Sequence, residues 1–287
     1  MKLGEYQRTL IRRLTESGVE SPGLCSRLII EKATGIGRDD FIFALDREIS
    51  ASETKRIEQL TARRRAGEPM AYILGEREFY NASFIVSQSV LIPRPETEAL
   101  VELALRAGKG EDLVFADIGC GSGCVGLSIA LERPTWRGVL IDNSASALAV
   151  ARENRARLGA SANFILGNLF ALPFGASSLD LVVSNPPYIA ENERGEVCAE
   201  TLAYEPVSAL FSSQEGLAHI RGLVSQASVV LRDGGSLILE HGFRQQDSVI
   251  KILEDSSFSE IRGHRDLAGL PRCVTARKTG GCRKWRS

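Results

Sequence analysis

The segment Asn185-Pro186-Pro187-Tyr188 carries the residue types best suited to chemistry in this chain. It follows Leu179–Val183, an apolar run that predicts a buried strand. Two consecutive prolines lack backbone N–H groups, so the chain must leave the sheet at Asn185. The Asn185 side-chain oxygen and the Pro186 carbonyl can both accept hydrogen bonds from one planar NH2 group, and the Tyr188 ring can lie against it. We therefore expect a site for an amide or an exocyclic amine at the carboxyl end of a strand, where open α/β sheets bind ligands.

A glycine-rich stretch, Asp117-Ile118-Gly119-Cys120-Gly121-Ser122-Gly123, joins a predicted strand to a predicted helix. Glycines permit a tight turn and a close approach to a ligand, and the helix N-terminus offers unpaired N–H groups. Two cofactors fit such a loop. The run from Gly121 to Gly126 matches the GxGxxG of dinucleotide enzymes, with Asp142 roughly twenty residues on to bind a ribose hydroxyl. The register that starts at Asp117 fits S-adenosylmethionine enzymes better, again with Asp142 at the ribose.

Composition limits the class of protein. The chain has 287 residues, of which 44% are hydrophobic and 25% charged, which is typical of a globular protein with one large and one smaller domain. Lys+Arg 35 against Asp+Glu 36 gives a net charge of -1, so nothing indicates a nucleic-acid-binding surface. Residues 1–17 lack an uncharged core, so we expect neither a signal peptide nor a membrane span, and a cytoplasmic location. The 6 cysteines form no CxxC pair, so no metal site and no disulfide framework is expected.

Residues 1–75 predict a small helical bundle. Apolar residues recur at helical spacing up to Gly18, and further helices are expected over Ser21–Gly35, Asp39–Arg47 and Ser50–Ala66. The last of these begins with a capping box, Ser50-Ala51-Ser52-Glu53. The bundle contains no catalytic constellation, so we interpret it as a packed recognition or scaffold domain. Residues 76–93 predict a β-hairpin that connects it to the rest of the chain.

Residues 94–279 alternate strand and helix, which predicts a mostly parallel seven-stranded sheet with helices on both faces, a Rossmann-like α/β fold. Residues 280–287 form a basic tail, which we expect to be disordered. The predicted strands are Leu113–Ile118, Gly138–Ile141, Asn163–Leu166, Leu179–Val183, Ser236–Glu240, Glu260–Arg265 and Arg272–Lys278, and the predicted helices start near Glu96, Gly123, Ser144, Gly216 and Gln246.

Several charged residues outside these motifs were weighed for a catalytic role. His241 follows a predicted strand without a partner residue and is interpreted as structural. Glu205 and Glu240 resemble a carboxylate pair, but we interpret them as hydrogen-bonded groups near the pocket. Arg94 and the cluster Arg63–Arg65 are interpreted as solvated charges.

The glycine-rich stretch and the Asn185 turn together resemble methyltransferases that modify amino groups in planar systems. The stretch Leu91-Ile92-Pro93-Arg94-Pro95-Glu96-Thr97-Glu98 narrows the resemblance to the HemK/PrmC family, protein-(glutamine-N5) methyltransferases that act on peptide chain release factors. The resemblance spans the chain from the helical domain to the last strand. It implies a class I S-adenosylmethionine-dependent methyltransferase domain with a small N-terminal helical bundle.

The resemblance also implies roles for individual residues. Asn185, Pro186 and Tyr188 would be catalytic, and these three with Pro187 would hold the glutamine side chain. Asn168 stands where the family more often has Asp, and its oxygen would still accept from the adenine amine. The residues implied to bind S-adenosyl-L-methionine are Gly119, Cys120, Gly121, Ser122, Gly123, Asp142, Asn168, Leu169 and Asn185. No metal is implied.

Other functions remain open at this point. A relative that methylates a glutamine of a ribosomal protein is the closest alternative, and an adenine-N6 nucleic-acid methyltransferase would use the same Asn185 turn. A nucleotide-binding module without methyl transfer is the third, and the Asn185 turn argues against it. The neutral charge balance argues against nucleic acid. We expect a monomer whose partners are release factors, without direct contact to nucleic acid or membrane.

Overall fold

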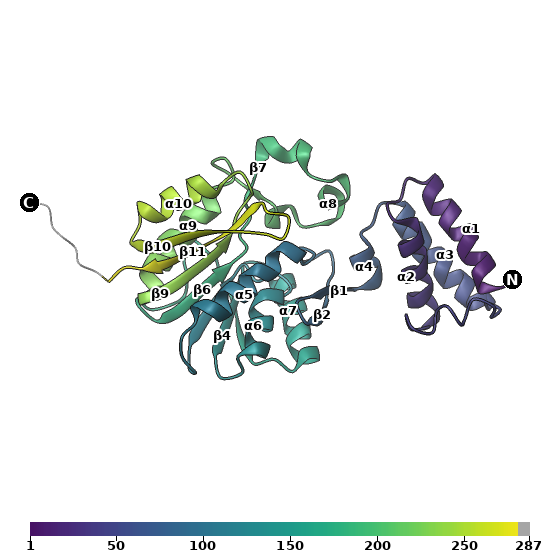
Figure 1. The fold of residues 1–287 in the computed structure, drawn as a ribbon, viewed down its shortest axis with the longest axis horizontal. Coiled ribbons are helices and arrows are strands. Elements are labelled where there is room, and N and C mark those ends of the chain that lie inside the picture. Colours follow the sequence, from purple (N-terminus) through teal and green to yellow (C-terminus); the bar gives the residue numbers. More distant parts are fainter. Residues whose placement is uncertain (281–287) are drawn as a thin grey trace, which may run out of the picture. The chain divides into compact units, whose positions relative to one another are not determined.

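The computed structural model describes residues 1–280, so residues 281–287 of the predicted basic tail lie outside the described residues. The chain divides into two compact units (Figure 1). The first comprises residues 1–76 together with 199–204, and the second comprises residues 77–198 and the remainder of the described chain from 205. The segment 199–204 therefore belongs to the helical unit although it follows the Asn185 turn in sequence.

The first unit is a bundle of helices around a small apolar core. Leu10, Leu14, Ile29 and Ile57 are fully buried in it, because each lies on the apolar stripe of its helix. The Ser50–Glu53 capping box forms as predicted, with the Glu53 N–H on Ser50 Oγ at 3.2 Å. The helices are α1 (Leu3–Glu16), α2 (Pro22–Thr34), α3 (Ala51–Arg65), α4 (Met70–Leu74) and α8 (Ala199–Tyr204).

The predicted helix over Asp39–Arg47 is wrong, because these residues form turns. The carbonyls of Leu45 and Arg47 accept the N–H groups of Gly4 and Leu3 at 2.9 and 2.8 Å, so they serve the open first turn of α1. If this segment were helical, those carbonyls would point along the axis of that helix instead of toward the N–H groups of α1. Phe43 in this segment is 86% exposed.

The arginine cluster at the end of α3 is only in part the solvated face that its composition indicated: Arg63 and Arg65 are exposed, but all three side chains have partners. Arg64 is the clearest case, since its side chain is only 11% exposed and Nη1 lies 2.6 Å from Glu200 Oε2 on α8. Arg63 pairs with Glu68 at 2.7 Å, and Arg65 donates to Ser17 Oγ at 2.9 Å. The three charges hold the bundle together.

The second unit is built on a seven-stranded sheet in the order β10-β11-β9-β6-β3-β4-β5. Every pair is parallel except those made by β11, so the sheet is mostly parallel as predicted. Within the segment predicted as a hairpin, β1 (Glu76–Phe79) pairs with β2 (Ala82–Ile85). The sheet strands are β3 (Val114–Ile118), β4 (Arg137–Asp142), β5 (Ala162–Leu166), β6 (Leu179–Ser184), β9 (Leu231–Glu240), β10 (Phe258–Arg265) and β11 (Pro271–Lys278).

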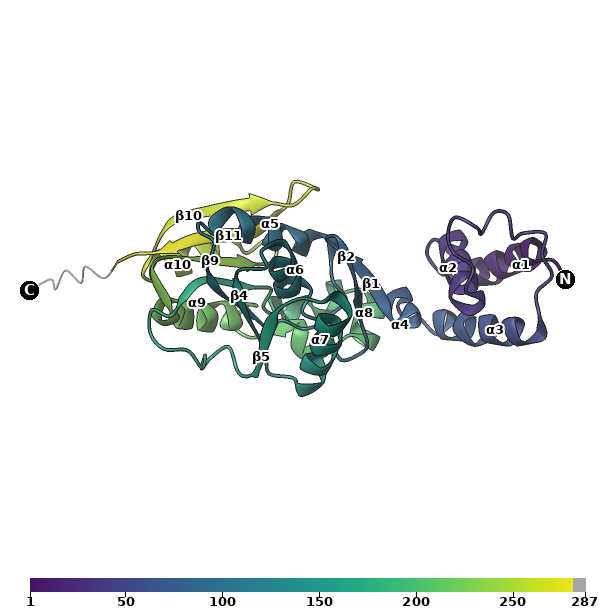
Figure 2. The same ribbon diagram turned by 90° about the horizontal axis from the view of Figure 1, so that it is seen from below.

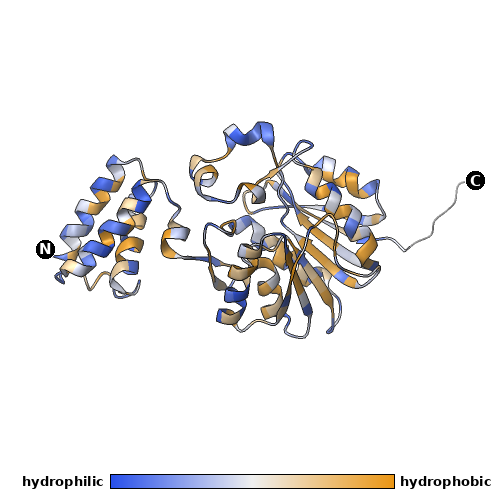
Figure 3. Ribbon diagram, turned by 180° about the vertical axis from the view of Figure 1, so that it is seen from behind, coloured by the Kyte–Doolittle hydropathy of each residue, from blue (hydrophilic) through white to orange (hydrophobic). Residues whose placement is uncertain are grey.

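Helices cover both faces of the sheet (Figure 2). Alternate residues of the central strands enter two separate cores. Phe115 of β3 packs with α5 (Glu98–Ala107), α6 (Cys124–Glu132) and α7 (Ala145–Leu158), whereas its neighbour Ala116 packs with α9 (Ala218–Val230) and α10 (Gln246–Glu254). A strand buried on both faces needs apolar residues throughout, which is why the strands are mostly orange in Figure 3. The short elements are η1 (Pro95–Thr97), β7 (Ile189–Ala190), η2 (Glu191–Glu196), η3 (Val207–Ala209) and β8 (Phe211–Ser212).

The strand order reverses between β3 and β6. From β3 the chain crosses to β4 on one side, while β6 pairs with β9 on the other. Ile118 and Ser184 are register partners, so the glycine-rich loop and the Asn185 turn leave the sheet at adjacent points of the same edge. Such a reversal opens a crevice at the carboxyl ends of the strands. Among residues 1–280, no helix is long and apolar enough to cross a membrane.

Candidate active site

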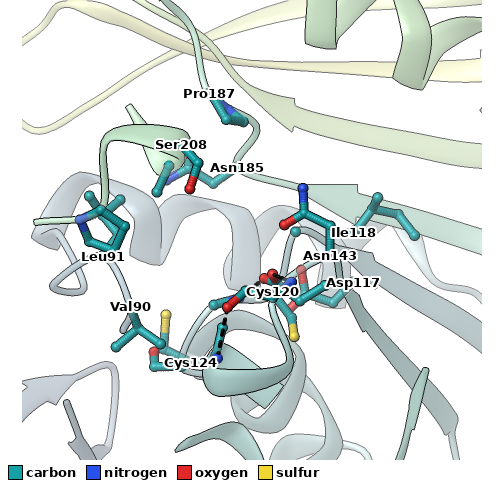
Figure 4. Close-up of a pocket in the computed structure, with 18 of the residues that line it drawn as sticks. Val90, Leu91, Asp117, Ile118, Cys120, Cys124, Asn143, Asn185, Pro187 and Ser208 are labelled. Carbon is teal, nitrogen blue, oxygen red and sulfur yellow. Dashed lines mark hydrogen bonds between the residues drawn. The ribbon is translucent and has the colours of Figure 1, made fainter. Parts of the chain in front are cut away.

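A cavity of about 340 Å³ lies at this strand reversal (Figure 4). In the view of Figure 4, Asn185 and Pro187 lie on one side of the cavity and Cys120 and Cys124 on the other. The remaining wall comes from segments within 88–97, 141–147, 167–169 and 206–209, and from His219. Both motifs that the sequence singled out therefore face one cavity.

The glycine-rich loop is held open by backbone conformation. Gly119, Gly121 and Gly123 have φ of 74°, 54° and 80°, in the left-handed region where other residues are strained. An added Cβ on Gly119 or Gly121 would meet no atom within 4 Å. The loop is tied to the next strand by two hydrogen bonds to the Ile141 carbonyl, from the N–H groups of Gly119 (2.8 Å) and Cys120 (2.9 Å). The glycines thus form an open loop, here called the cradle, whose backbone is held in place by β4.

Asp142, at the end of β4, joins this loop to the start of α7. Its Oδ2 accepts from the Gly121 N–H at 2.8 Å and its Oδ1 from the Ser144 N–H at 2.9 Å. Each carboxylate oxygen has a second lone pair, which can accept a hydrogen bond from a further donor in the cavity. Asp142 is therefore both a brace for the loop and an acceptor at the cavity wall.

Asp117, at the start of the loop, is 2% exposed and its Oδ2 accepts from the Gly126 N–H at 2.8 Å. Burial raises the pKa of this carboxyl to about 7. An added Cβ on Gly126 would lie 2.9 Å from Asp117 Oδ2 and 2.8 Å from Leu140 Cγ, which explains the glycine. Asp117 holds the first turn of α6 against the sheet.

The Asn185 turn is anchored by side chains. Ser184 Oγ donates to the Ile118 carbonyl at 2.6 Å, and Asn185 Nδ2 donates to Thr97 Oγ1 at 3.2 Å. The Thr97 hydroxyl donates to Glu240 Oε2 at 2.7 Å, and the Tyr188 hydroxyl donates to Glu240 Oε1 at 3.1 Å. Glu240 is fully buried, and this burial raises its pKa to about 7. With its NH2 on Thr97, Asn185 turns its Oδ1 away from Thr97.

Glu205 and Glu240 do not form a carboxylate pair, because each has its own partners. Glu205 accepts from Arg94 Nη2 at 2.5 Å and from the Ile92 N–H at 3.0 Å. Their interpretation as hydrogen-bonded groups near the pocket is confirmed. The interpretation of Arg94 as a solvated charge is wrong, since this ion pair fixes it beside the cavity.

His241 is completely buried, and its Nδ1 lies 2.9 Å from the Gly242 carbonyl. Burial lowers its pKa. It is absent from the cavity wall, which agrees with a structural residue.

Comparisons with known proteins agree along the chain. A family model described as PrmC N-terminal domain matches residues 5–75, and one described as methyltransferase small domain matches residues 96–216. The chain is 38% identical over 271 residues to a release factor glutamine methyltransferase of Nitratidesulfovibrio vulgaris, covering 93% of this chain and 92% of that protein. It is 41% identical over 261 residues to the protein of that name in Vibrio cholerae, covering 91% of each. The chain belongs to the release factor glutamine methyltransferase family. The predicted resemblance is confirmed.

A solved structure supports the fold. A ribosomal protein L11 methylase of Lactobacillus delbrueckii subsp. bulgaricus aligns with a TM-score of 0.50 at 19% identity, covering 68% of this chain and 84% of that one. At this identity the likeness concerns the fold alone. The Rossmann-like methyltransferase fold expected from the sequence is confirmed.

In this methyltransferase the cavity wall contains most of the residues predicted for the site. Tyr188 has its hydroxyl on Glu240, and Asn168 Oδ1 accepts from the Phe170 N–H at 3.0 Å, so both are engaged beside the cavity. Gly123 and Pro186 likewise belong to the adjoining turns. The predicted residues in the wall are Gly119, Cys120, Gly121, Ser122, Asp142, Leu169, Asn185 and Pro187, and those outside it are Gly123, Asn168, Pro186 and Tyr188.

Sequence reasoning missed other residues of the wall, chiefly Thr97, Asn143, Ser208 and His219. Asn143 could have been found, because it follows Asp142 at the end of a strand. Thr97 belongs to the stretch Leu91–Glu98 that carries the family resemblance, but the resemblance implied no site role for it. His219 gave no signal, since its pairing with Ser212 Oγ at 2.7 Å depends on a turn that no pattern predicts.

Proposed function

We propose that this chain transfers a methyl group from S-adenosylmethionine to the side-chain amide nitrogen of a glutamine in a peptide chain release factor. The proposal is supported by the relatives of that name and, in the site itself, by one observation. The Asn185 amide at the cavity wall is fixed by Thr97, so that its oxygen is available to an NH2 group. The translation-related substrate also agrees with the expected cytoplasmic location.

The residues of the cavity fit S-adenosylmethionine. The open cradle at Gly119 and Gly121 admits the methionine part, and the N-terminus of α6 offers N–H groups to its carboxylate. Asp142 retains a lone pair on each oxygen for ribose hydroxyls. Leu169 offers an apolar surface to adenine. Asn168 contributes to adenine binding only through the lone pair that Phe170 leaves free.

Catalysis in this proposal is a matter of position. When bound, S-adenosylmethionine supplies a methyl group on a positive sulfur, an electrophile that needs no activation. The amide nitrogen is a poor nucleophile because its lone pair is delocalised into the carbonyl. Asn185 Oδ1 and the Pro186 carbonyl would accept its two hydrogens and aim the lone pair at the methyl carbon. These bonds would strengthen as positive charge develops on nitrogen while the methyl group leaves the sulfur, and the methylated nitrogen would then lose one proton to solvent.

The acceptor protein is tested by methyl transfer. Purified release factor, ribosomal protein and DNA are incubated side by side with the enzyme and labelled S-adenosylmethionine. We expect label in the release factor alone, and none when its acceptor glutamine is replaced by asparagine, because one methylene less withdraws the nitrogen. Label in the ribosomal protein would favour the alternative glutamine substrate, and label in DNA would overturn the substrate class.

The helical bundle, residues 1–75, is proposed as the part that recognises the release factor. A glutamine amide alone cannot distinguish one protein from another, so specificity needs a second surface. The division into a recognition domain, a connecting hairpin over 76–93 and a catalytic domain over 94–279 stays a prediction, as does the monomer.

A further inference from the structure

We propose that Thr97 and Glu240 are positioning residues, which set the orientation of the Asn185 side-chain amide so that its oxygen faces the substrate. This inference rests on the proposed function, in which Asn185 receives a glutamine amide. It concerns a hydrogen-bond chain of three side chains, Asn185 to Thr97 to Glu240, that links segments far apart in sequence.

The chain of hydrogen bonds is well defined. Asn185 Nδ2 donates to Thr97 Oγ1 at 3.2 Å, and Thr97 Oγ1 donates to Glu240 Oε2 at 2.7 Å. Thr97 is 3% exposed and Glu240 is 0% exposed, so water does not compete for either group. The second oxygen of Glu240 accepts from the Tyr188 hydroxyl at 3.1 Å, which fixes the carboxylate from the other side.

The ionised Glu240 carboxylate determines which group donates and which accepts in each of these hydrogen bonds. A carboxylate only accepts, so the single hydroxyl proton of Thr97 is committed to Glu240. Thr97 Oγ1 can then only accept a hydrogen bond from Asn185, so Asn185 must donate from its NH2 group. The amide oxygen consequently points the other way. Turned by 180°, Asn185 would present its NH2 to the NH2 of the substrate, and two donors would face each other.

The state of Glu240 depends on the charged groups around it. Arg272 on β11 favours the ionised form, whereas Glu96 on η1 disfavours it. The Tyr188 hydroxyl, Cys273 on β11 and Cys124 on α6 also face it, the two thiols with pKa values raised by burial. Burial raises the pKa of Glu240 to about 7.

A protonated Glu240 has an O–H that can donate to Thr97. The Thr97 hydroxyl is then free to donate to Asn185 Oδ1, and the amide can turn. Transfer should therefore be slower below pH 7 and faster above it.

The kinetic test compares Thr97→Val, Thr97→Ser and Glu240→Gln with the wild type. Valine keeps the shape of threonine but offers no acceptor, and glutamine removes the charge that commits the Thr97 proton. We expect kcat to fall about 10- to 100-fold in both, since a buried group is left mispaired. Thr97→Ser should restore most of the rate. The affinity for S-adenosylmethionine, measured by calorimetry, should stay within a few-fold.

Two comparisons exclude a merely structural effect. Glu102→Gln removes an exposed carboxylate of α5 that pairs with Arg106, and it should leave the rate unchanged. The rise of kcat near pH 7 should be present in the wild type and Glu102→Gln but absent in Glu240→Gln. If Glu240→Gln does not fold, the comparison of kcat between Thr97→Val and Thr97→Ser tests the proposal by itself. A folded Thr97→Val with wild-type kcat would overturn the proposal.

A measurement without substrate separates this inference from the proposed function. In a ¹⁵N-labelled sample, the Asn185 side-chain NH2 resonances, assigned by their loss in Asn185→Ala, should shift in Thr97→Val and in Glu240→Gln but not in Glu102→Gln. They should also shift with pH near 7. If the wild type shows these shifts but does not methylate release factor, the proposed substrate is refuted, whereas the hydrogen-bond chain from Asn185 to Glu240 is supported. Unchanged resonances would refute the chain even in an active enzyme.

Discussion

At the scale of single residues, Asp142 has two roles, whereas its sequence motif indicates only one, the binding of a ribose hydroxyl. It holds the Gly121 and Ser144 N–H groups and, in the proposed function, accepts from ribose hydroxyls. Replacing Asp142 should thus affect the cofactor and the loop together, whereas replacing Asn185 should abolish methyl transfer and leave cofactor affinity within a few-fold.

Asp142→Ala should weaken S-adenosylmethionine binding by roughly 1.5–3 kcal/mol, because a charge-assisted hydrogen bond is lost. Calorimetry measures the affinity, with NAD as the control ligand. Asp142→Asn keeps one acceptor oxygen and should fall between Asp142→Ala and the wild type. Tight binding of NAD that disappears in Asp142→Ala, together with no binding of S-adenosylmethionine, would favour the dinucleotide interpretation of the glycine loop.

Asp117 should make folding stability depend on pH. Its pKa is about 7 in the folded protein and its ordinary value is 3.8, so the folded state holds the proton more tightly. The resulting stabilisation is fully present below the ordinary pKa and is lost as pH rises to about 7, at about 1.4 kcal/mol per pH unit. Urea unfolding at pH 4 to 8 measures it. The slope between pH 4 and 7 should be smaller in Asp117→Asn, and an identical slope would contradict the buried protonated carboxyl.

At the scale of elements, α6 approaches the sheet too closely for a side chain at Gly126. The contacts of an added Cβ with Leu140 Cγ at 2.8 Å and Asp117 Oδ2 at 2.9 Å leave no room, because both neighbours are buried. The same closeness brings the first turn of α6 to the cavity, where Cys124 and Val125 line the wall. Packing of one helix thus determines the geometry of the glycine-rich loop.

Gly126→Ala should lower the free energy of unfolding by about 1–3 kcal/mol through overpacking. Gly23→Ala is a matched control within α2, where an added Cβ meets nothing within 4 Å. The control should be neutral or raise the free energy of unfolding by about 0.4–1 kcal/mol, because alanine restricts the unfolded chain. Urea unfolding compares the two, and equal stabilities would show that α6 can move away from the sheet.

At the scale of the whole molecule, the helical unit is built from two parts of the chain. Residues 199–204 join it through Arg64–Glu200 and through the Tyr204 hydroxyl on the Ala66 carbonyl at 2.8 Å. These residues come shortly after the Asn185 turn in sequence. The chain thus returns to the helical unit for residues 199–204 before it continues in the second unit.

A shortened chain that begins at Pro69 should keep S-adenosylmethionine binding and lose most of its activity on intact release factor. The cavity wall lies entirely in residues 88–219, so the cofactor site survives the deletion. Calorimetry and methyl transfer measure the two effects. Glu200→Gln in the full chain is the milder control, since it keeps the bundle and weakens the pair with Arg64. Undiminished methylation of the intact release factor would remove the bundle from recognition.

The sequence by itself determined the order and kind of most elements. Six of the seven sheet strands begin within two residues of the predicted ranges, and β9 begins five residues earlier than predicted. The central strands β3 and β6 were the clearest, because a strand buried on both faces is a continuous apolar run between turns. The glycine loop and the Asn185 turn were also predictable, since proline and glycine restrict or free the backbone locally. Their placement at one edge followed from the rule for parallel sheets.

Tertiary structure decided which side chains meet. Thr97 finds Glu240 across 143 positions of the chain, Arg94 finds Glu205 across 111, and Arg64 finds Glu200 across 136. The segment 39–47 has a helix-like composition, yet its carbonyls serve α1 instead. Local patterns reflect the neighbours of a residue in sequence, whereas hydrogen-bond partners depend on strand order and on which groups are buried together. The orientation of Asn185 therefore could not be read from Asn185-Pro186-Pro187-Tyr188 alone.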